Sequence, residues 1–171
     1  MTVENGNGLT DSNSYVDITF ADSYFSERGE TAWANFSDEE KEKYLIRATD
    51  YIDNIFQWYG QRQSESQALR FPRKNLYDYE GLEIEGVPNL LKQAVCDAAL
   101  ILSDGTELFE SKNANGNIVS ETIGSLSFSY NKNNDENITG ESLYECLNTK
   151  LRGLFRDTSK KRIVSGKVMR V

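Results

Sequence analysis

A stripe of apolar residues at helical spacing, between Ser37 and Gly60, constrains the fold of this chain more than any other feature. Ser37 and Glu40 stand at the spacing of a capping box, and the acidic residues at 38–40 suit the positive end of a helix dipole. Apolar residues then recur every three or four positions, as on the core-facing side of a helix: Tyr44, Leu45, Ala48, Tyr51, Ile52, Ile55 and Phe56. The opposite side, which we expect to face solvent, carries Lys41, Lys43, Arg47, Asp50, Asp53 and Asn54. Gly60 stands where a C-cap glycine would end the helix.

Three further segments have helical periodicity, so we expect a bundle of about four helices. The first helix is predicted from about Thr19, where Thr19 and Asp22 have capping-box spacing, to Gly29. The third starts at Pro88, which suits a first helical turn, and it is apolar enough to be the central core helix. The fourth is predicted over about residues 141–156. Its apolar stripe consists of Leu143, Tyr144, Leu147, Leu151, Leu154 and Phe155.

The periodicity changes from helical to alternating between the third and fourth helices. Leu126, Phe128 and Tyr130 alternate with serines, which predicts a half-buried strand. Residues 118–123 are expected to form the strand before it, with a bulge or break at Gly124.

Together these segments predict a mainly α protein with two parts. Residues 1–157 form a small helical-bundle domain, which includes a β-strand or hairpin arm over about residues 117–131. Residues 158–171 form a basic, extended C-terminal tail. The first 13 residues are rich in Gly and Asn, which predicts a flexible arm or an irregular start.

The formal net charge of −8 is divided unevenly along the chain. Residues 150–171 hold eight basic residues and one acidic residue, whereas residues 1–149 hold 11 basic and 26 acidic residues. Such asymmetry is typical of an interaction surface. We predict that the C-terminal tail docks on another protein. Its basic cluster would contact an acidic surface of that partner, and its apolar residues would fill apolar slots on it. The predicted docking residues are Lys160, Lys161, Arg162, Ile163, Val164, Val168 and Met169.

The composition argues against an enzyme. The chain has no His, which removes Ser–His and Cys–His pairs, His metal ligands and the usual proton shuttle near neutral pH. Cys96 and Cys146 fit no metal or redox spacing, so we expect two buried thiols in a reducing compartment. We predict no catalytic residue, no metal site and no cofactor. No stretch approaches the ~20 apolar residues of a membrane span, and the polar start indicates no signal peptide.

One loop leaves nucleic-acid binding open as an alternative. Basic residues interleaved with aromatic rings can bind single strands through phosphate pairing and base stacking. The candidate contacts are Arg62, Arg70, Phe71, Arg73 and Lys74. The competing interpretation is a loop whose aromatic residues anchor the core and whose arginines pair with the acidic body. The net charge of −8 argues against a broad DNA-binding face, because affinity for DNA depends mainly on phosphate neutralisation.

Several sequence blocks resemble the head-to-tail adaptor (connector) proteins of phages, over roughly residues 9–130 and more loosely in the fourth helix. The first blocks are residues 14–16 (SYV), 21–25 (ADSYF) and 28–29 (RG), with Trp33. The next are residues 37–41 (SDEEK), 45–53 (LIRATDYID), 58–62 (WYGQR) and 67–73 (QALRFPR). The last are Val87-Pro88, before an Ala-rich helix, and Glu121 before Ile123-Gly124. Some similar sequences carry the label "DnaT-like single-stranded-DNA-binding", which is the source of the alternative function.

The resemblance implies a structural protein of the virion, located at the head–tail junction and in the host cytoplasm during assembly. Its copies would form a ring, commonly of twelve, under the portal protein, extending the DNA channel and carrying the phage tail or a stopper (nozzle) protein. Genomic double-stranded DNA would pass without sequence-specific binding, which suits an acidic body. The residues after 157 depart from the family pattern, so docking of the C-terminal tail on portal or on a neighbouring subunit is inferred from those residues alone.

Overall fold

The computed structural model describes residues 1–105, 119–123, 126–130 and 140–156. Its helices are α1 (Ile18–Glu27), the short 3-10 helix η1 (Ala32–Asn35), α2 (Asp38–Ile55), α3 (Asn89–Ser103) and α4 (Gly140–Lys150). Its strands form two antiparallel pairs, β1 (Gln61–Arg62) with β2 (Arg73–Lys74) and β3 (Val119–Ile123) with β4 (Leu126–Tyr130). The protein is therefore mainly α with a small β arm, as predicted. The C-terminal tail, all seven of its predicted docking residues and Gly124 lie outside the described residues.

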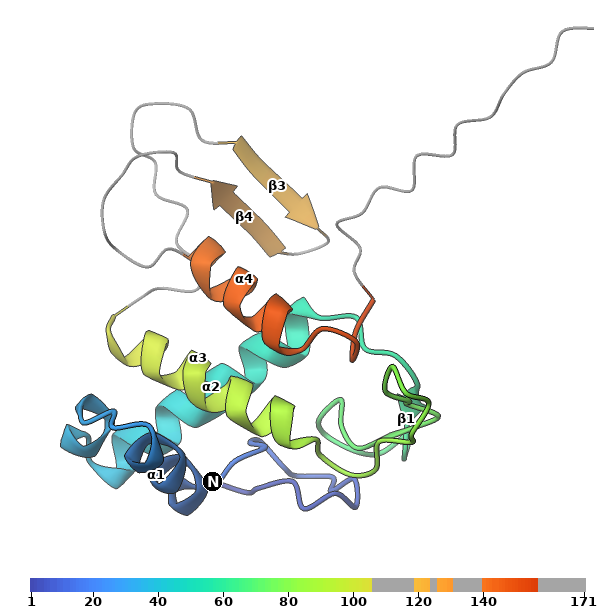
Figure 1. Ribbon diagram of the computed structural model, residues 1–171, viewed down its shortest axis with the longest axis horizontal. Coiled ribbons are helices and arrows are strands. Elements are labelled where there is room, and N and C mark those ends of the chain that lie inside the picture. The colour runs from blue at the N-terminus through green and yellow to red at the C-terminus, as the bar shows by residue number, and fades with distance from the viewer. Residues whose placement is uncertain (106–118, 124–125, 131–139, 157–171) are drawn as a thin grey trace, which may run out of the picture.

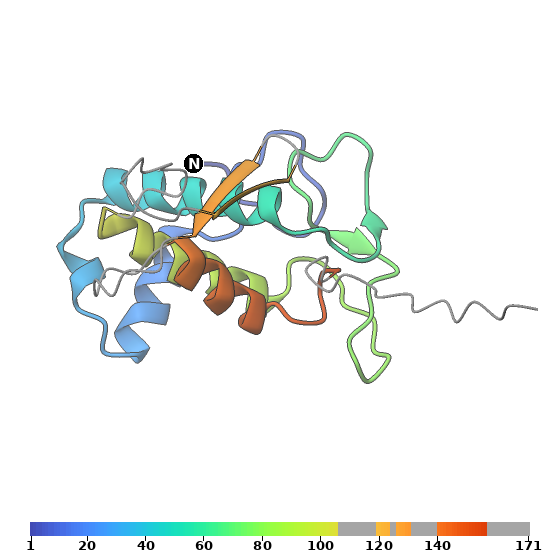
Figure 2. The same cartoon turned by 90° about the horizontal axis from the view of Figure 1, so that it is seen from above.

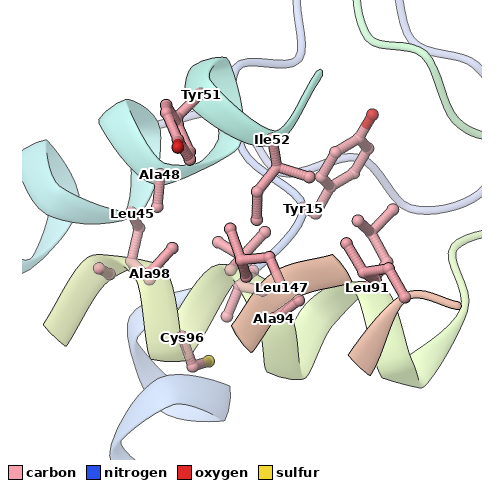
Figure 3. Packing of buried hydrophobic residues seen from close by; sticks show 14 of the residues in the cluster. Tyr15, Leu45, Ala48, Tyr51, Ile52, Leu91, Ala94, Cys96, Ala98 and Leu147 are labelled. Carbon is pink, nitrogen blue, oxygen red and sulfur yellow. The ribbon is translucent and has the colours of Figure 1, made fainter. Parts of the chain in front are cut away.

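The bundle is built around α3, the most apolar helix. It packs along α2, and α4 and α1 also lie against it (Figures 1 and 2). Small side chains, Ala48 on α2 and Ala94 and Ala98 on α3, line the core between these helices, where Leu147 of α4 also lies (Figure 3). The buried residues of α3 are Leu91, Ala94, Val95, Cys96, Ala98, Ala99 and Leu102. The prediction of a central core helix starting near Pro88 is confirmed.

The start of α2 follows its sequence signal closely. The Glu40 carboxylate accepts a hydrogen bond from the Ser37 amide at 2.9 Å, and the Ser37 hydroxyl accepts one from the Glu40 amide at 3.4 Å, completing the predicted capping box. Gly60, however, is not the C-cap, because the helix already ends at Ile55 and Phe56 caps it. Lys41 and Asp53, expected on the solvent side, are both buried because other segments of the chain cover them.

Asp22 illustrates this covering of α2 by α1. The predicted pairing of Thr19 with Asp22 is wrong, because Asp17 caps α1 by accepting a hydrogen bond from the Phe20 amide at 2.7 Å. The Asp22 carboxylate instead accepts hydrogen bonds from Trp33 Nε1 and from Lys41 Nζ, both at 2.9 Å. Asp22 therefore joins α1 to η1 and to the buried ammonium group of α2.

The C-terminal end of the body is a short helix followed by a turn. α4 ends at Lys150, earlier than predicted, and the chain reverses near Gly153, where φ is +98°. The predicted stripe is otherwise confirmed, since Leu143, Leu147, Leu151, Leu154 and Phe155 are all buried. Cys96 is buried as expected, but Cys146 is exposed. Cys146 lies one helical position off the apolar stripe, which explains the error.

The first 13 residues form an irregular start, which is one of the two predicted alternatives. They are joined to the body by the ion pair of the Met1 amino group with Glu42 and by the Ala68 amide, which donates to the Leu9 carbonyl at 2.9 Å. The Glu4 side chain is buried, and its carboxylate accepts hydrogen bonds from the Ser12 hydroxyl and from four consecutive backbone amides, those of residues 6–9. The Glu4 amide itself donates to the Ser14 carbonyl at 2.8 Å. A buried carboxylate with five donors is well compensated, so this segment is not a flexible arm.

The β3–β4 hairpin is drawn beyond α4 in Figure 1. Among the described residues, the hairpin strands pair extensively only with each other, and no helix packs against them to a comparable extent. The described part of the chain contains no helix with the length and apolarity to span a membrane.

Candidate functional site

The loop between α2 and α3 holds the predicted nucleic-acid contacts, and its aromatic ring belongs to the core. Phe71 is completely buried and contacts the ring of Trp58 edge-on, with the centroids 4.9 Å apart. It makes a second edge contact with Tyr15, at 6.2 Å. The structure therefore supports the interpretation of Phe71 as a core anchor, since a ring with no exposed surface cannot stack on a base.

Arg73 is used inside the protein as well. Its guanidinium group donates to the carbonyl oxygens of Arg70 at 3.0 Å, of Gly60 at 2.9 Å and of Tyr59. Burial lowers the pKa of Arg73 from its usual value. This side chain joins residues 59–60, just before β1, to Arg70, just before β2, so its role is chiefly structural.

A buried Tyr15–Asp53 pair joins this loop to α2. The Tyr15 hydroxyl donates to one Asp53 carboxylate oxygen at 2.6 Å, and the Arg70 amide donates to the other at 2.9 Å. The Phe71 amide donates to the Tyr15 hydroxyl at 3.1 Å. The prediction that Asp53 lies on a solvated face is therefore wrong, because residues near the N-terminus and the α2–α3 loop close over it. Burial raises the pKa of Asp53 to about 6 and moves that of Tyr15 well above its usual value.

The raised pKa of Asp53 predicts a pH-dependent contribution to stability. The folded-state pKa is about 6, against an ordinary value of 3.8 for an unfolded aspartate. The folded state therefore binds more protons than the unfolded state between these values. The contribution is fully present below about pH 4 and is lost as the pH rises through about 6, with a total change of about 3 kcal/mol.

The measurement is the free energy of unfolding of the wild type minus that of Asp53→Asn, from urea titrations across pH 4–7. Subtracting the two proteins removes the contributions of all other carboxylates. We expect the difference to become less favourable to the wild type as the pH rises. A difference that is independent of pH would contradict the assignment of the buried ionisation to Asp53.

The basic side chains of this region form a cluster, which we call the basic patch. It consists of Arg62, Arg70, Arg73, Lys74 and Arg156, of which Arg73 is half-buried and the other four are exposed. Arg62 pairs with Arg73 in the β1–β2 register, and Arg73 is hydrogen-bonded to the Arg70 carbonyl. Arg156 lies over the ring of Tyr59, with its Cζ 5.9 Å from the centroid. The structure thus brings together three of the predicted basic contacts, Arg62, Arg70 and Arg73, and Lys74 follows Arg73 on β2.

Two members of this surface were missed by sequence reasoning. Tyr59 is 42% exposed, whereas Phe71 has no exposed surface. The solvent-accessible aromatic ring beside the basic patch is therefore that of Tyr59. Arg156 reaches it because the Arg156 amide donates to the Gln57 carbonyl at 2.7 Å, and the Tyr59 amide donates to the Leu154 carbonyl at 3.0 Å. No local pattern in the sequence indicates contacts between segments so far apart.

A second exposed surface, which we call the acidic loop, covers residues 77–85. Asp78 organises its turn: one carboxylate oxygen accepts hydrogen bonds from the Glu80 amide at 2.9 Å and the Leu82 amide at 2.8 Å. Tyr77 and Glu83 form an antiparallel bridge, and the Asp78 amide donates to the Leu82 carbonyl. Tyr79 and Leu82 are 95% and 63% exposed. Among the described residues, no group of three or more acidic or Cys side chains is arranged to hold a metal ion.

Lys150 is separate from both surfaces. Its ammonium group donates to Tyr24 of α1 at 2.8 Å and pairs with Asp97 of α3, and the Tyr24 hydroxyl donates to Asp97 at 2.8 Å. The first basic residue of the positive C-terminal region therefore holds α1, α3 and α4 together. The positive charge available to a partner begins after it.

Comparison with known proteins identifies the family of this chain. No curated protein and no solved structure matches the chain. The whole chain, residues 1–171, matches a family model described as "Putative DnaT-like ssDNA binding protein". The protein belongs to this DnaT-like family.

Proposed function

We propose that this protein is a structural, non-enzymatic head-to-tail adaptor of a tailed bacteriophage. Its copies form a ring under the portal, extend the DNA channel and carry the phage tail. The observation that carries the proposal is the β3–β4 hairpin, whose described strands pair with each other but pack extensively against no described helix.

The hairpin register places apolar residues on one face. Val119 pairs with Tyr130, Glu121 with Phe128 and Ile123 with Leu126, while the intervening pairs are Ser120 with Ser129 and Thr122 with Ser127. Because partners in an antiparallel pair share a face, one face is mostly apolar and the other consists of Ser and Thr. An isolated two-stranded hairpin is marginally stable in water, and no described helix covers this one extensively. A neighbouring subunit would bury the apolar face and could pair with an outer edge.

The sequence blocks that resemble the phage adaptors contribute side chains to the core of the body, and this supports the same proposal. Tyr15, Asp53 and Phe71 come from three of these blocks and form one buried hydrogen-bonded cluster. The blocks therefore contribute residues to the core, as a fold shared with the adaptors would require. The acidic body would let DNA pass through the ring with little adhesion, since binding to DNA depends on phosphate neutralisation by basic groups.

A pair of hairpin variants tests the proposal. Phe128→Asp places a charge on the apolar face, whereas Ser127→Asp places the same charge one residue away on the Ser/Thr face. We expect Phe128→Asp to remain a folded monomer that no longer forms rings on portal, because burying an unpaired carboxylate is costly. Ser127→Asp should assemble like the wild type. Electron microscopy of each protein mixed with the portal protein gives the readout.

Failure of the wild-type protein to bind portal at any concentration would overturn the proposal. Normal ring formation by Phe128→Asp would instead show that the hairpin face is not the interface, and would remove the observation that carries the proposal.

Single-stranded-DNA binding is the second candidate, favoured by the family description and by the basic patch around Tyr59. It predicts salt-sensitive binding of oligonucleotides, measured by fluorescence anisotropy. Arg70→Ala and Lys74→Ala should weaken that binding without unfolding the protein, because both side chains are exposed. No detectable binding by the wild type at low salt would remove this candidate.

A further inference from the structure

The acidic loop presents the most exposed apolar groups of the described chain. Tyr79 and Leu82 stand at its tip, and Tyr77 at its base is 49% exposed. The two hydrogen bonds to Asp78 fix the turn that carries them. In Figure 2 this segment, between β2 and α3, projects from the body on the side where β1 lies. Large exposed apolar side chains on an ordered support are typical of a protein interface.

The charges around this tip indicate the chemistry of the partner. Residues 77–85 include four acidic residues, Asp78, Glu80, Glu83 and Glu85, and no basic residue. An interface with an apolar centre and an acidic rim fits a partner segment that combines apolar side chains with Lys and Arg.

We propose that the acidic loop binds the C-terminal tail, residues 158–171, of a neighbouring copy of this chain. That segment contains five basic residues and no acidic one, and its apolar residues lie between the basic ones. Ile163, Val164, Val168 and Met169 meet the exposed apolar tip, and the Lys and Arg side chains meet the four carboxylates. The two segments are complementary in charge and both have apolar groups to cover.

A neighbouring copy is the occupant because the loop and the tail are two different surfaces of one chain. A contact between different surfaces is heterologous, and repeated heterologous contacts form a ring when the rotation from copy to copy closes. This step rests on the proposed ring. The tail follows Arg156, which lies against Tyr59, and the 15 residues after it can span up to about 50 Å. That length is sufficient to cross to an adjacent subunit.

Crosslinking of mixed copies tests the inference. In a Cys146→Ser background, which removes the exposed thiol, one protein carries Glu80→Cys and a second carries Val164→Cys. The two are mixed with a thiol-specific bismaleimide, with and without portal. We expect crosslinked dimers of one protein of each kind. Glu27→Cys on α1 is exposed and lies in a different part of the chain, so it should give no dimer with Val164→Cys.

Charge reversal supplies a second readout. In the protein that carries Glu80→Cys, adding Glu83→Lys and Glu85→Lys should reduce the crosslinked fraction about tenfold at low salt, since several weak pairs become repulsive. Adding Lys160→Glu and Lys161→Glu to the partner should restore crosslinking. A rescue of this kind shows that the two segments meet, which a merely destabilised loop would not produce.

Each outcome decides the inference. Rings on portal without loop-to-tail crosslinks would overturn it and leave the adaptor function standing. Crosslinks without portal rings would support it and count against the adaptor function. A protein carrying both cysteines that reacts only within its own chain would show that the tail binds its own loop, and would overturn binding to a neighbour.

Discussion

Phe71→Ala is expected to lower the free energy of unfolding by about 3–5 kcal/mol, the usual cost of removing a buried aromatic ring. Phe71 has no exposed surface and packs between Trp58 and Tyr15. Its loss would leave a cavity where the loop, α2 and the N-terminal segment meet. Urea unfolding followed by circular dichroism measures the change.

Tyr77→Ala is the matched control for Phe71→Ala. It removes an aromatic ring from the same loop, but that ring is 49% exposed, so the expected loss is below about 1 kcal/mol. Similar losses for the two variants would contradict the assignment of Phe71 to the core. They would also reopen the possibility that its ring contacts a ligand.

Gly60→Ala is expected to lower the free energy of unfolding by more than about 2 kcal/mol. Gly60 has φ of +70°, and a Cβ atom there would lie 2.5 Å from the carbonyl oxygen of Lys74. A side chain therefore meets both an unfavourable backbone conformation and a backbone clash with the end of β2. A backbone shift that relieves the clash would also displace the residue 60 carbonyl, to which Arg73 donates a hydrogen bond.

Gly81→Ala separates these two causes. Gly81 has φ of +85°, but no atom lies within 4 Å of the position of a Cβ. Only the conformational cost applies, about 1 kcal/mol. Equal losses at the two positions would show that the close approach of Gly60 to Lys74 contributes nothing to stability.

Local signals in the sequence were sufficient for most of the fold. The Ser37–Glu40 capping box, the apolar stripe of α2 and the change to alternating periodicity in the hairpin all depend on residues a few positions apart. Errors arose where a side chain finds its partner far along the chain. Asp53 is buried because segments distant in the sequence supply its hydrogen-bond donors, the Tyr15 hydroxyl and the Arg70 amide. Asp22 does not form the predicted capping pair, because its carboxylate binds Trp33 and Lys41 instead.

The candidate surfaces show the same difference between what local sequence predicts and what long-range contacts decide. The basic residues of the α2–α3 loop were identified from composition alone, but which of them remain available depends on tertiary contacts. Arg73 is bound to three carbonyl groups, whereas Tyr59 and Arg156 meet only because the turn after α4 packs beside the end of α2. Periodicity and spacing contain no information about such contacts.

Native mass spectrometry of the full chain mixed with the portal protein tests the central claim most directly. The adaptor account predicts a complex whose mass equals the portal ring plus a closed set of adaptor copies, with twelve copies expected from the family resemblance. Separate masses for portal and free chain at every mixing ratio, together with a chain–oligonucleotide complex under the same conditions, would contradict it.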